Sequence, residues 1–134
     1  MASVSFSPAS AFILKTLLMK AYIDSKTHSV LDYTVALFII ALPWIFGFSE
    51  SERATWVSLV TGCLIILLAL FTRYEGGVFK VIPLTTHLIA DILLGTFLAA
   101  SPWIFLYSDI TYWPHFVFGC LGLVIPIITL RALI

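Results

Sequence analysis

Long apolar stretches alternate with short polar ones along this chain of 134 residues. Four of them approach the length of about 20 residues that a helix needs to cross the hydrocarbon core of a bilayer. They are 30–48, 56–72, 88–107 and 113–130. Because lipid offers the backbone no hydrogen-bond partners, spanning segments are helices or closed-barrel strands, and these stretches are too long and too continuously apolar for barrel strands. The pattern predicts an all-α membrane protein with four transmembrane helices.

The composition supports this class and excludes others. Hydrophobic residues make up 61% of the chain and charged residues only 10%, against about 25% charged residues in soluble proteins. Seven Lys and Arg residues balance seven Asp and Glu residues, so no basic patch is available for a nucleic-acid partner. The two cysteines, Cys63 and Cys120, lie far apart inside apolar stretches, which excludes a disulfide framework and a Cys-x-x-Cys motif.

The chain contains an internal repeat. The segment ALPWIFGFSE at 41–50 returns as ASPWIFLYSD at 100–109, a shift of 59 positions. After the following loop the shift becomes 57, which aligns Thr72 with Thr129. Each copy therefore predicts one helical hairpin. The expected organisation is an N-terminal tail (1–26), a first repeat with two helices (27–75), a cytoplasmic linker (76–85) and a second repeat with two helices (86–134).

Cations lie mostly on one side of the four predicted spans, and only Arg53 flanks the other side. The positive-inside rule then places both termini in the cytoplasm. With two spans in each copy, the hairpins insert in the same orientation and are related by a pseudo-two-fold axis along the membrane normal. The expected location is the inner (plasma) membrane of a bacterium. Beyond the bilayer, the expected partners are another membrane protein or further copies of the chain.

The N-terminal tail is expected to be retained, because Lys15 and Lys20 interrupt its apolar part and no clear small-residue cleavage site follows. As an amphipathic helix it would lie in the headgroup region with its lysine side chains reaching water. A partly disordered tail is the alternative. The apolar residues of such a helix are Phe12, Ile13, Leu17, Leu18 and Tyr22.

Two Pro-Trp pairs, Pro43-Trp44 and Pro102-Trp103, lie about one turn before the ends of their predicted spans. Each proline removes an amide donor and should bend its helix. The tryptophans fall at the outer ends of the spans, where indole rings anchor membrane proteins at the interface. The predicted anchors are Trp44, Trp56, Trp103 and Trp113, with Tyr107 and Tyr112 extending the belt. A binding role for the Pro-Trp pairs is the alternative.

The Ser101-Pro102-Trp103 motif lies in the first helix of a two-helix unit and has a partner copy upstream. In this it resembles the SPW repeat family of small bacterial membrane proteins, over about residues 27–134. The first copy departs from the motif, with Leu42 in place of the serine. The resemblance implies an integral membrane location and a repeat architecture, and it implies no reaction and no ligand.

A Thr-His-x-x-x-Asp unit begins each repeat. The two units are Thr27, His28 and Asp32, and Thr86, His87 and Asp91. Residues four apart share a helix face, so each histidine lies over its aspartate. One turn further on come the small residues Ala36 and Gly95. Because small residues let membrane helices approach closely, we expect this face inside the bundle, with the first and third spans meeting near Ala36 and Gly95.

Three explanations remain open for these polar residues. Thr27 and Thr86 cap their helices while each aspartate pairs with its histidine at the headgroup level. Alternatively, the two His and two Asp side chains meet and pass protons or a substrate. A third arrangement is a tetrahedral site for zinc or a similar ion.

No known catalytic motif occurs in the sequence, and we expect no catalytic residue, no metal and no cofactor. The expected function is a structural or accessory role, as a subunit or scaffold in a membrane assembly. A small transport or proton-conducting module that uses His28, Asp32, His87 and Asp91 is the alternative. A metal-dependent membrane enzyme is the third hypothesis.

Overall fold

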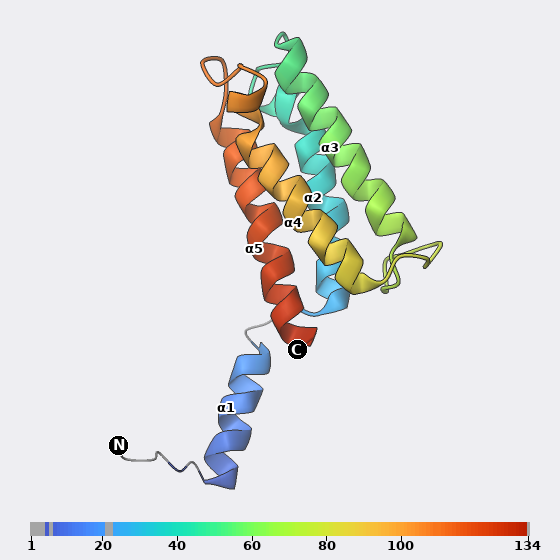
Figure 1. Cartoon of the computed structure of the whole chain (residues 1–134), viewed down its shortest axis with the longest axis vertical. Coiled ribbons are helices and arrows are strands. Elements are labelled where there is room, and N and C mark those ends of the chain that lie inside the picture. The colour runs from blue at the N-terminus through green and yellow to red at the C-terminus, as the bar shows by residue number, and fades with distance from the viewer. Residues whose placement is uncertain (1–4, 6, 21–22, 134) are drawn as a thin grey trace.

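The computed structural model describes residues 5, 7–20 and 23–133, and this part of the chain forms five helices and no β-strand beyond one isolated bridge (Figure 1). The helices are α1 (Pro8–Lys20), α2 (Ser25–Ile45), α3 (Glu52–Phe71), α4 (Leu84–Ile104) and α5 (Trp113–Leu133). All but α1 are long and apolar enough to cross a membrane. The predicted fold class, all-α with four candidate spans, is confirmed. Three of the four helices begin earlier than the apolar stretches, because they include polar residues such as His28 and His87.

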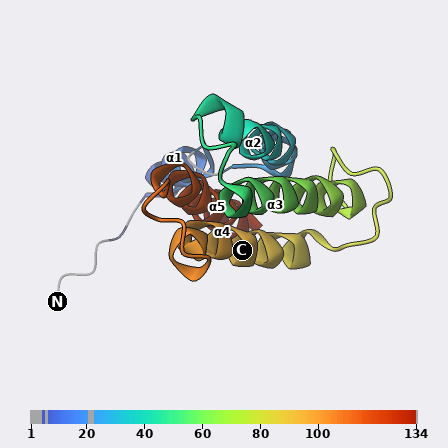
Figure 2. The ribbon, with the colours of Figure 1, turned by 90° about the horizontal axis from the view of Figure 1, so that it is seen from above.

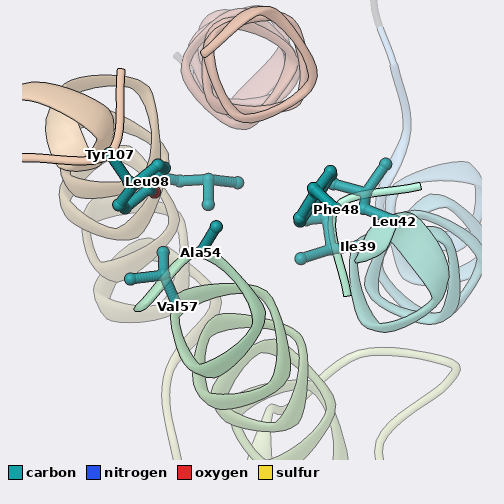
Figure 3. Close-up of a cluster of buried hydrophobic side chains, with 7 residues drawn as sticks. All are labelled: Ile39, Leu42, Phe48, Ala54, Val57, Leu98 and Tyr107. Carbon is teal, nitrogen blue, oxygen red and sulfur yellow. The ribbon is translucent and has the colours of Figure 1, made fainter. Parts of the chain in front are cut away.

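The four long helices form a bundle in which hairpin partners make the main contacts. α2 packs mostly on α3, and α4 mostly on α5; α3 also contacts α4, and α2 contacts α5. Figure 2 shows α3 between α2 and α4. α2 and α4 therefore lie diagonally across the bundle, as Figure 3 also shows. The α2–α3 and α4–α5 loops lie at one end, and the α3–α4 loop lies at the other (Figure 1). Insertion of both hairpins in one orientation about a pseudo-two-fold axis stays a prediction.

Small residues bring the helices of each hairpin into close contact. A Cβ atom added to Gly95 would lie 2.6 Å from the backbone of Gly122 on α5, and one added to Gly62 on α3 would lie 2.9 Å from the carbonyl oxygen of Ala36. The expectation that the first and third spans meet near Ala36 and Gly95 is therefore wrong. These helices are diagonal, and their small residues face their own hairpin partners instead.

The apolar core fills the half of the bundle nearest the two hairpin loops (Figure 3). Its residues are Ile39, Leu42, Phe48, Ala54, Val57, Leu98 and Tyr107. Tyr107 is only 1% exposed, so its expected place in the interfacial belt is wrong, whereas Tyr112 is 51% exposed. The chain reverses direction at Leu106, which has a positive φ of 56°, and this turn brings the Tyr107 ring back into the core.

The Pro-Trp pairs lie in the last turn of α2 and of α4. Each helix ends two residues beyond its proline, and the chain folds back so that the amides of Phe48 and Tyr107 donate to the carbonyls of Pro43 and Pro102, at 2.8 and 2.9 Å. Such a bond closes a helix end in the Schellman motif. All four tryptophans are between 48% and 61% exposed, and their role as interfacial anchors stays a prediction.

The N-terminal tail contains α1, which lies beyond the end of the bundle where α2 begins (Figure 1). Phe12 and Ile13 are 71% and 57% exposed. The rest of the expected apolar face lies outside the described part of the chain, which does not include Tyr22 or the side chains of Leu17 and Leu18. Placement of α1 in the headgroup region stays a prediction.

Candidate functional site

Four ionisable side chains from the two diagonal helices meet at the axis of the bundle. His28 and Asp32 belong to α2, and His87 and Asp91 belong to α4. Both histidines are fully buried, and both aspartates are only 7% exposed. The structure thus brings together all four residues of the predicted polar cluster, which we call the His-Asp centre. Because residues four apart share a helix face, the two members of each His-Asp pair reach the axis together.

Each imidazole faces a carboxylate of its own repeat and a carboxylate of the other repeat. His28 Nε2 lies 3.2 Å from Asp32 Oδ1 and 3.0 Å from Asp91 Oδ2. His87 Nε2 lies 3.0 Å from Oδ2 of both Asp32 and Asp91. The two imidazole rings are nearly perpendicular, at 76°, with centroids 5.4 Å apart. The centre therefore joins the two repeats across the bundle.

The outer nitrogen of each imidazole contacts a threonine of the other repeat. His28 Nδ1 lies 2.8 Å from Thr129 Oγ1 on α5, and His87 Nδ1 lies 2.7 Å from Thr72 Oγ1 at the end of α3. Each threonine hydroxyl also donates to the carbonyl four residues earlier in its own helix. A hydroxyl has only one proton, so it accepts from the imidazole, and Nδ1 of each histidine is the protonated nitrogen.

Sequence reasoning did not assign these two threonines to the site. The repeat aligns Thr72 with Thr129. In the sequence, however, each histidine lies near the start of its repeat and each threonine near the end. Their polar side chains recur at equivalent positions in otherwise apolar segments, which was the signal that could have found them. Only the packing of the two repeats against each other places each threonine beside a histidine.

Tyr74, in the α3–α4 loop, is a third residue that the sequence did not reveal. Its hydroxyl donates to Asp32 Oδ2 at 2.7 Å. Burial and the Asp32 carboxylate raise the pKa of Tyr74, so the phenol keeps its proton and remains a donor. The equivalent position of the second repeat holds an exposed arginine, Arg131. The two halves of the centre consequently differ in the partners of their carboxylates.

The α3–α4 loop covers the end of the bundle next to the His-Asp centre. The Tyr33 hydroxyl on α2 donates to the carbonyl of Gly76 at 2.8 Å, and the Ser25 hydroxyl donates to Glu75 at 2.8 Å. A backbone bridge between Thr72 and Ile82 joins the two arms of the loop. This segment, expected as a linker, is therefore fastened to α2 and holds Tyr74 over the centre.

The helix caps differ from the expected ones. α2 is capped by Asp24, whose side chain accepts a hydrogen bond of 2.7 Å from the Thr27 amide, and hydrogen bonds from the Thr27 side chain and backbone lower the pKa of Asp24. The capping position of α4 is Pro83. The expectation that Thr27 and Thr86 cap their helices is wrong, because both helices begin two residues earlier and these threonines lie inside the first turn.

A cavity of about 30 Å³ adjoins the His-Asp centre. Its lining includes His28, Asp32 and Asp91, and most of its other walls are apolar side chains such as Ile39 and Leu98. Room of this size accepts one or two water molecules, each needing roughly 10–15 Å³ by this measure. The cavity lies between the centre and the apolar core.

The serine of the Ser-Pro-Trp motif has a structural partner. The hydroxyls of Ser101 and Tyr107 lie 2.6 Å apart, and Ser101 also donates to the carbonyl of Leu98. Burial raises the pKa of Tyr107 to about 12, so the phenol is neutral at physiological pH. In the first repeat the equivalent residues are Leu42 and Phe48. An apolar pair there replaces a hydroxyl pair, which explains why the first copy lacks the serine.

A third buried histidine lies near the hairpin loops. His115 on α5 is fully buried, and its Nε2 lies 2.8 Å from the hydroxyl of Ser58, the equivalent position of the first repeat. Its Nδ1 has no hydrogen-bond partner among the described residues. The rings of Phe48 and Tyr107 both lie with centroids 5.3 Å from the imidazole. With aromatic rings and no carboxylate beside it, His115 is a packed core residue.

Comparison with known proteins identifies the architecture and no activity. A family profile described as the SPW repeat domain matches residues 26–129, a range that contains all four residues of the His-Asp centre. No curated protein and no solved structure matches the chain. The chain therefore belongs to the SPW repeat family, as a membrane protein with four apolar helices long enough to span the bilayer.

Proposed function

We propose that the protein is a structural or accessory component of a membrane assembly, and that its bundle serves to hold two helical hairpins in one fixed arrangement. The hydrogen bonds and ion pairs between the repeats carry this proposal. His28 contacts Thr129 and Asp91 of the second repeat, while His87 contacts Thr72 and Asp32 of the first. Polar contacts inside a bilayer are expensive to break, because lipid offers no replacement partner.

The apolar core supports a closed body rather than a conduit. Ile39, Leu42, Phe48 and Leu98 are each at most 4% exposed and fill the bundle between the cavity and the hairpin loops. A path for ions across this half would require polar groups or water, and these side chains supply neither. The chemistry of the interior is thus enclosed, and a partner meets only the outer surface and the loops.

The outer surface of the bundle is strongly apolar on all four helices. Leu37, Trp56, Leu93 and Phe116 are examples from α2, α3, α4 and α5, and each is at least 48% exposed. Such a surface suits acyl chains and neighbouring transmembrane helices. Insertion into the inner membrane of a bacterium, with both termini in the cytoplasm, is part of the proposal, because the cations flank that side of the spans.

The assembly is tested in native membranes at the natural expression level. Intact membranes are cross-linked and, in parallel, solubilised in a mild detergent, and the tagged protein is sized by both routes. We expect one discrete species larger than the monomer, with the same fixed composition in both experiments. A monomer in both experiments would contradict the proposal.

A proton-conducting module is the second candidate, because three of the four clustered ionisable groups line a cavity that accepts water. Purified protein is reconstituted in liposomes under a pH gradient with valinomycin present. The double variant Asp32→Asn, Asp91→Asn removes both carboxylates, and His115→Gln serves as the control because it changes a buried histidine outside the centre. Proton flux in wild type and control that is absent in the double variant would establish conduction and overturn the closed body. Flux equal to that of empty liposomes would exclude conduction.

A further inference from the structure

We propose that the His-Asp centre binds one divalent transition-metal ion of the zinc class, held by His28, Asp32, His87 and Asp91. The four potential ligand atoms all lie within 4.8 Å of one another. This site goes beyond the structural role proposed above and does not depend on it, since a closed bundle is compatible with an empty or an occupied centre.

The His-Asp centre brings two buried carboxylates together. Asp32 and Asp91 place two carboxylates at the axis of the bundle, and the buried residues that the structure describes include no lysine and no arginine. Buried carboxylates require a compensating positive charge. Two units of positive charge come either from protons on both imidazoles or from one divalent cation. The geometry of the imidazoles distinguishes these two sources.

The threonine contacts determine the tautomer of the two neutral histidines. Thr129 and Thr72 accept from Nδ1 of His28 and His87, so in the neutral imidazole the lone pair is on Nε2 and is directed at the carboxylates. Two lone pairs facing carboxylate oxygens repel unless a cation lies between them. Metal-binding histidines in proteins are held in this way, with the other ring nitrogen donating to a fixed oxygen.

The His87 imidazole is not directed at either carboxylate. Its Nε2 lies 3.0 Å from an oxygen of Asp32 and from an oxygen of Asp91, yet its ring axis is aligned with neither, and this fully buried nitrogen has no hydrogen-bond partner among the described residues. A proton on Nε2 would favour a nearly linear bond to one oxygen. His28 Nε2 is directed at Asp91 Oδ2 at 3.0 Å, where a bound ion would take the place of a proton. The Nε2 atom of His87 is thus close to two carboxylates and bonded to neither, an arrangement that suits an ion shared by all three side chains.

The spacing of the four ligand atoms is close to that of a zinc site. Zinc bonds of about 2.0–2.1 Å in a tetrahedral site separate neighbouring ligand atoms by roughly 3.3 Å. The four His–Asp separations are 3.0–3.2 Å. Since all four ligand atoms lie within 4.8 Å of one another, the widest pair must approach by at most roughly 1.5 Å to reach this separation. Two imidazole and two carboxylate ligands favour zinc and its neighbours over Mg²⁺ or Ca²⁺, which prefer all-oxygen sites.

Metal content is measured first on wild-type protein purified in detergent without chelators. The bound ion is then removed, and Co²⁺ is titrated into the folded apoprotein, whose helical content is checked by circular dichroism. We expect one Zn²⁺ or one Co²⁺ per chain, and visible absorption bands of tetrahedral cobalt that Zn²⁺ displaces. Folded wild-type protein that binds neither ion would overturn the proposal without reference to any variant.

Variants then assign the binding to the centre. Asp32→Asn with Asp91→Asn should abolish the cobalt bands, whereas His115→Gln, which alters the buried histidine outside the centre, should retain them. Thr72→Val removes a positioning residue and should weaken Co²⁺ binding about 10–100-fold, with recovery in Thr72→Ser. Equal cobalt binding in the double aspartate variant would show that the ion binds elsewhere. None of these readouts depends on assembly with a partner, so failure here leaves the proposed function untouched.

Discussion

At the scale of single residues, hydroxyl groups determine how the buried polar side chains are satisfied. Thr72 and Thr129 accept from the two histidines of the centre, and Ser101 pairs with Tyr107 near the hairpin loops. In each case the partner is fully or almost fully buried. A buried donor that loses its only acceptor costs about 1–3 kcal/mol. The hydroxyls are therefore the positions where a small substitution should have a large effect.

Thr129→Val should lower the free energy of unfolding by about 1–3 kcal/mol, because the Nδ1–H group of His28 loses its acceptor while the side-chain volume stays nearly unchanged. Thr96→Val is the matched control: its hydroxyl makes the same bond to the carbonyl four residues earlier, but the side chain is exposed and contacts no histidine. Unfolding is followed by circular dichroism in mixed micelles of rising SDS fraction. Equal losses in both variants would contradict the role of the His28 contact.

Ser101→Ala and Tyr107→Phe should be coupled. In Ser101→Ala the Tyr107 hydroxyl loses its acceptor, and in Tyr107→Phe the Ser101 hydroxyl keeps only its bond to the Leu98 carbonyl. The double variant places an apolar pair here, as Leu42 and Phe48 do in the first repeat. We expect the double variant to lose less stability than the two single variants together, with a coupling free energy of about 1 kcal/mol. The same SDS titration measures it. Additive losses would mean that the two hydroxyls do not stabilise each other.

At the scale of helices, the two repeats close equivalent helix ends with different residues. α2 is followed by Gly47 with φ 69°, and α4 by Leu106 with φ 56°. The left-handed conformation costs a residue with a side chain about 1–2 kcal/mol, and glycine avoids this cost. Close packing is also unequal, since α4 and α5 approach through Gly95, Gly119 and Gly122. The two hairpins therefore differ in the backbone conformation at their helix ends and in their close helix contacts. These differences determine which substitutions each hairpin tolerates.

Leu106→Gly should stabilise the protein by about 1 kcal/mol, because the left-handed residue gains a compatible backbone and the leucine side chain, 79% exposed, leaves no core cavity. The reciprocal change Gly47→Leu should destabilise by a similar amount. A Cβ atom at Gly47 would meet nothing within 4 Å, so that cost comes from the backbone alone. If the two substitutions changed the free energy of unfolding in the same direction, this account would be contradicted.

Gly119→Ala should be more damaging than Gly122→Ala. A Cβ atom at Gly119 would lie 2.4 Å from the Ala99 backbone nitrogen, whereas one at Gly122 would lie 3.0 Å from its nearest neighbour, Gly95 Cα. Separating α5 from α4 should cost about 1–3 kcal/mol. At Gly122, the better helix propensity of alanine, about 1 kcal/mol, should offset most of a smaller strain. The comparison uses thermal unfolding, and equal melting temperatures would count against the close contact.

At the scale of the whole molecule, side-chain contacts join each repeat to the other across the bundle axis. Each hairpin packs tightly within itself through small residues, and the His-Asp centre and the apolar core join one hairpin to the other. The loops of both hairpins lie at one end, next to the tryptophans, and the α3–α4 loop lies at the other end, next to the centre (Figure 1). In a bilayer, this arrangement places the centre toward the side of the α3–α4 loop.

Cysteine labelling tests the orientation in the membrane. In a background without Cys63 and Cys120, single cysteines replace the exposed residues Glu50, Asp109 and Lys80. A membrane-impermeant maleimide added to intact cells should label positions 50 and 109, and it should label position 80 only after the membrane is opened. Labelling of positions 50 and 109 from opposite sides would contradict insertion of both hairpins in one orientation, and labelling of positions 50 and 80 from the same side would contradict α3 as a span.

Much of the architecture could be predicted from the chain alone. Apolar stretches long enough to span a bilayer permit only helices, because lipid cannot satisfy the backbone, and the repeat shows that the helices form two similar hairpins. The spacing of His28 and Asp32, and of His87 and Asp91, likewise places each pair on one helix face. These are local properties, and the sequence determined them by itself.

Only the tertiary structure decided which helices are neighbours and which groups meet. Ala36 and Gly95 face their hairpin partners because α2 and α4 are diagonal, a result that no periodicity contains. Thr72, Thr129 and Tyr74 reach the centre from distant positions in the chain, and Tyr107 enters the core through a left-handed turn. Packing of whole helices determines these contacts, and it depends on the fit of all their side chains at once rather than on any local pattern.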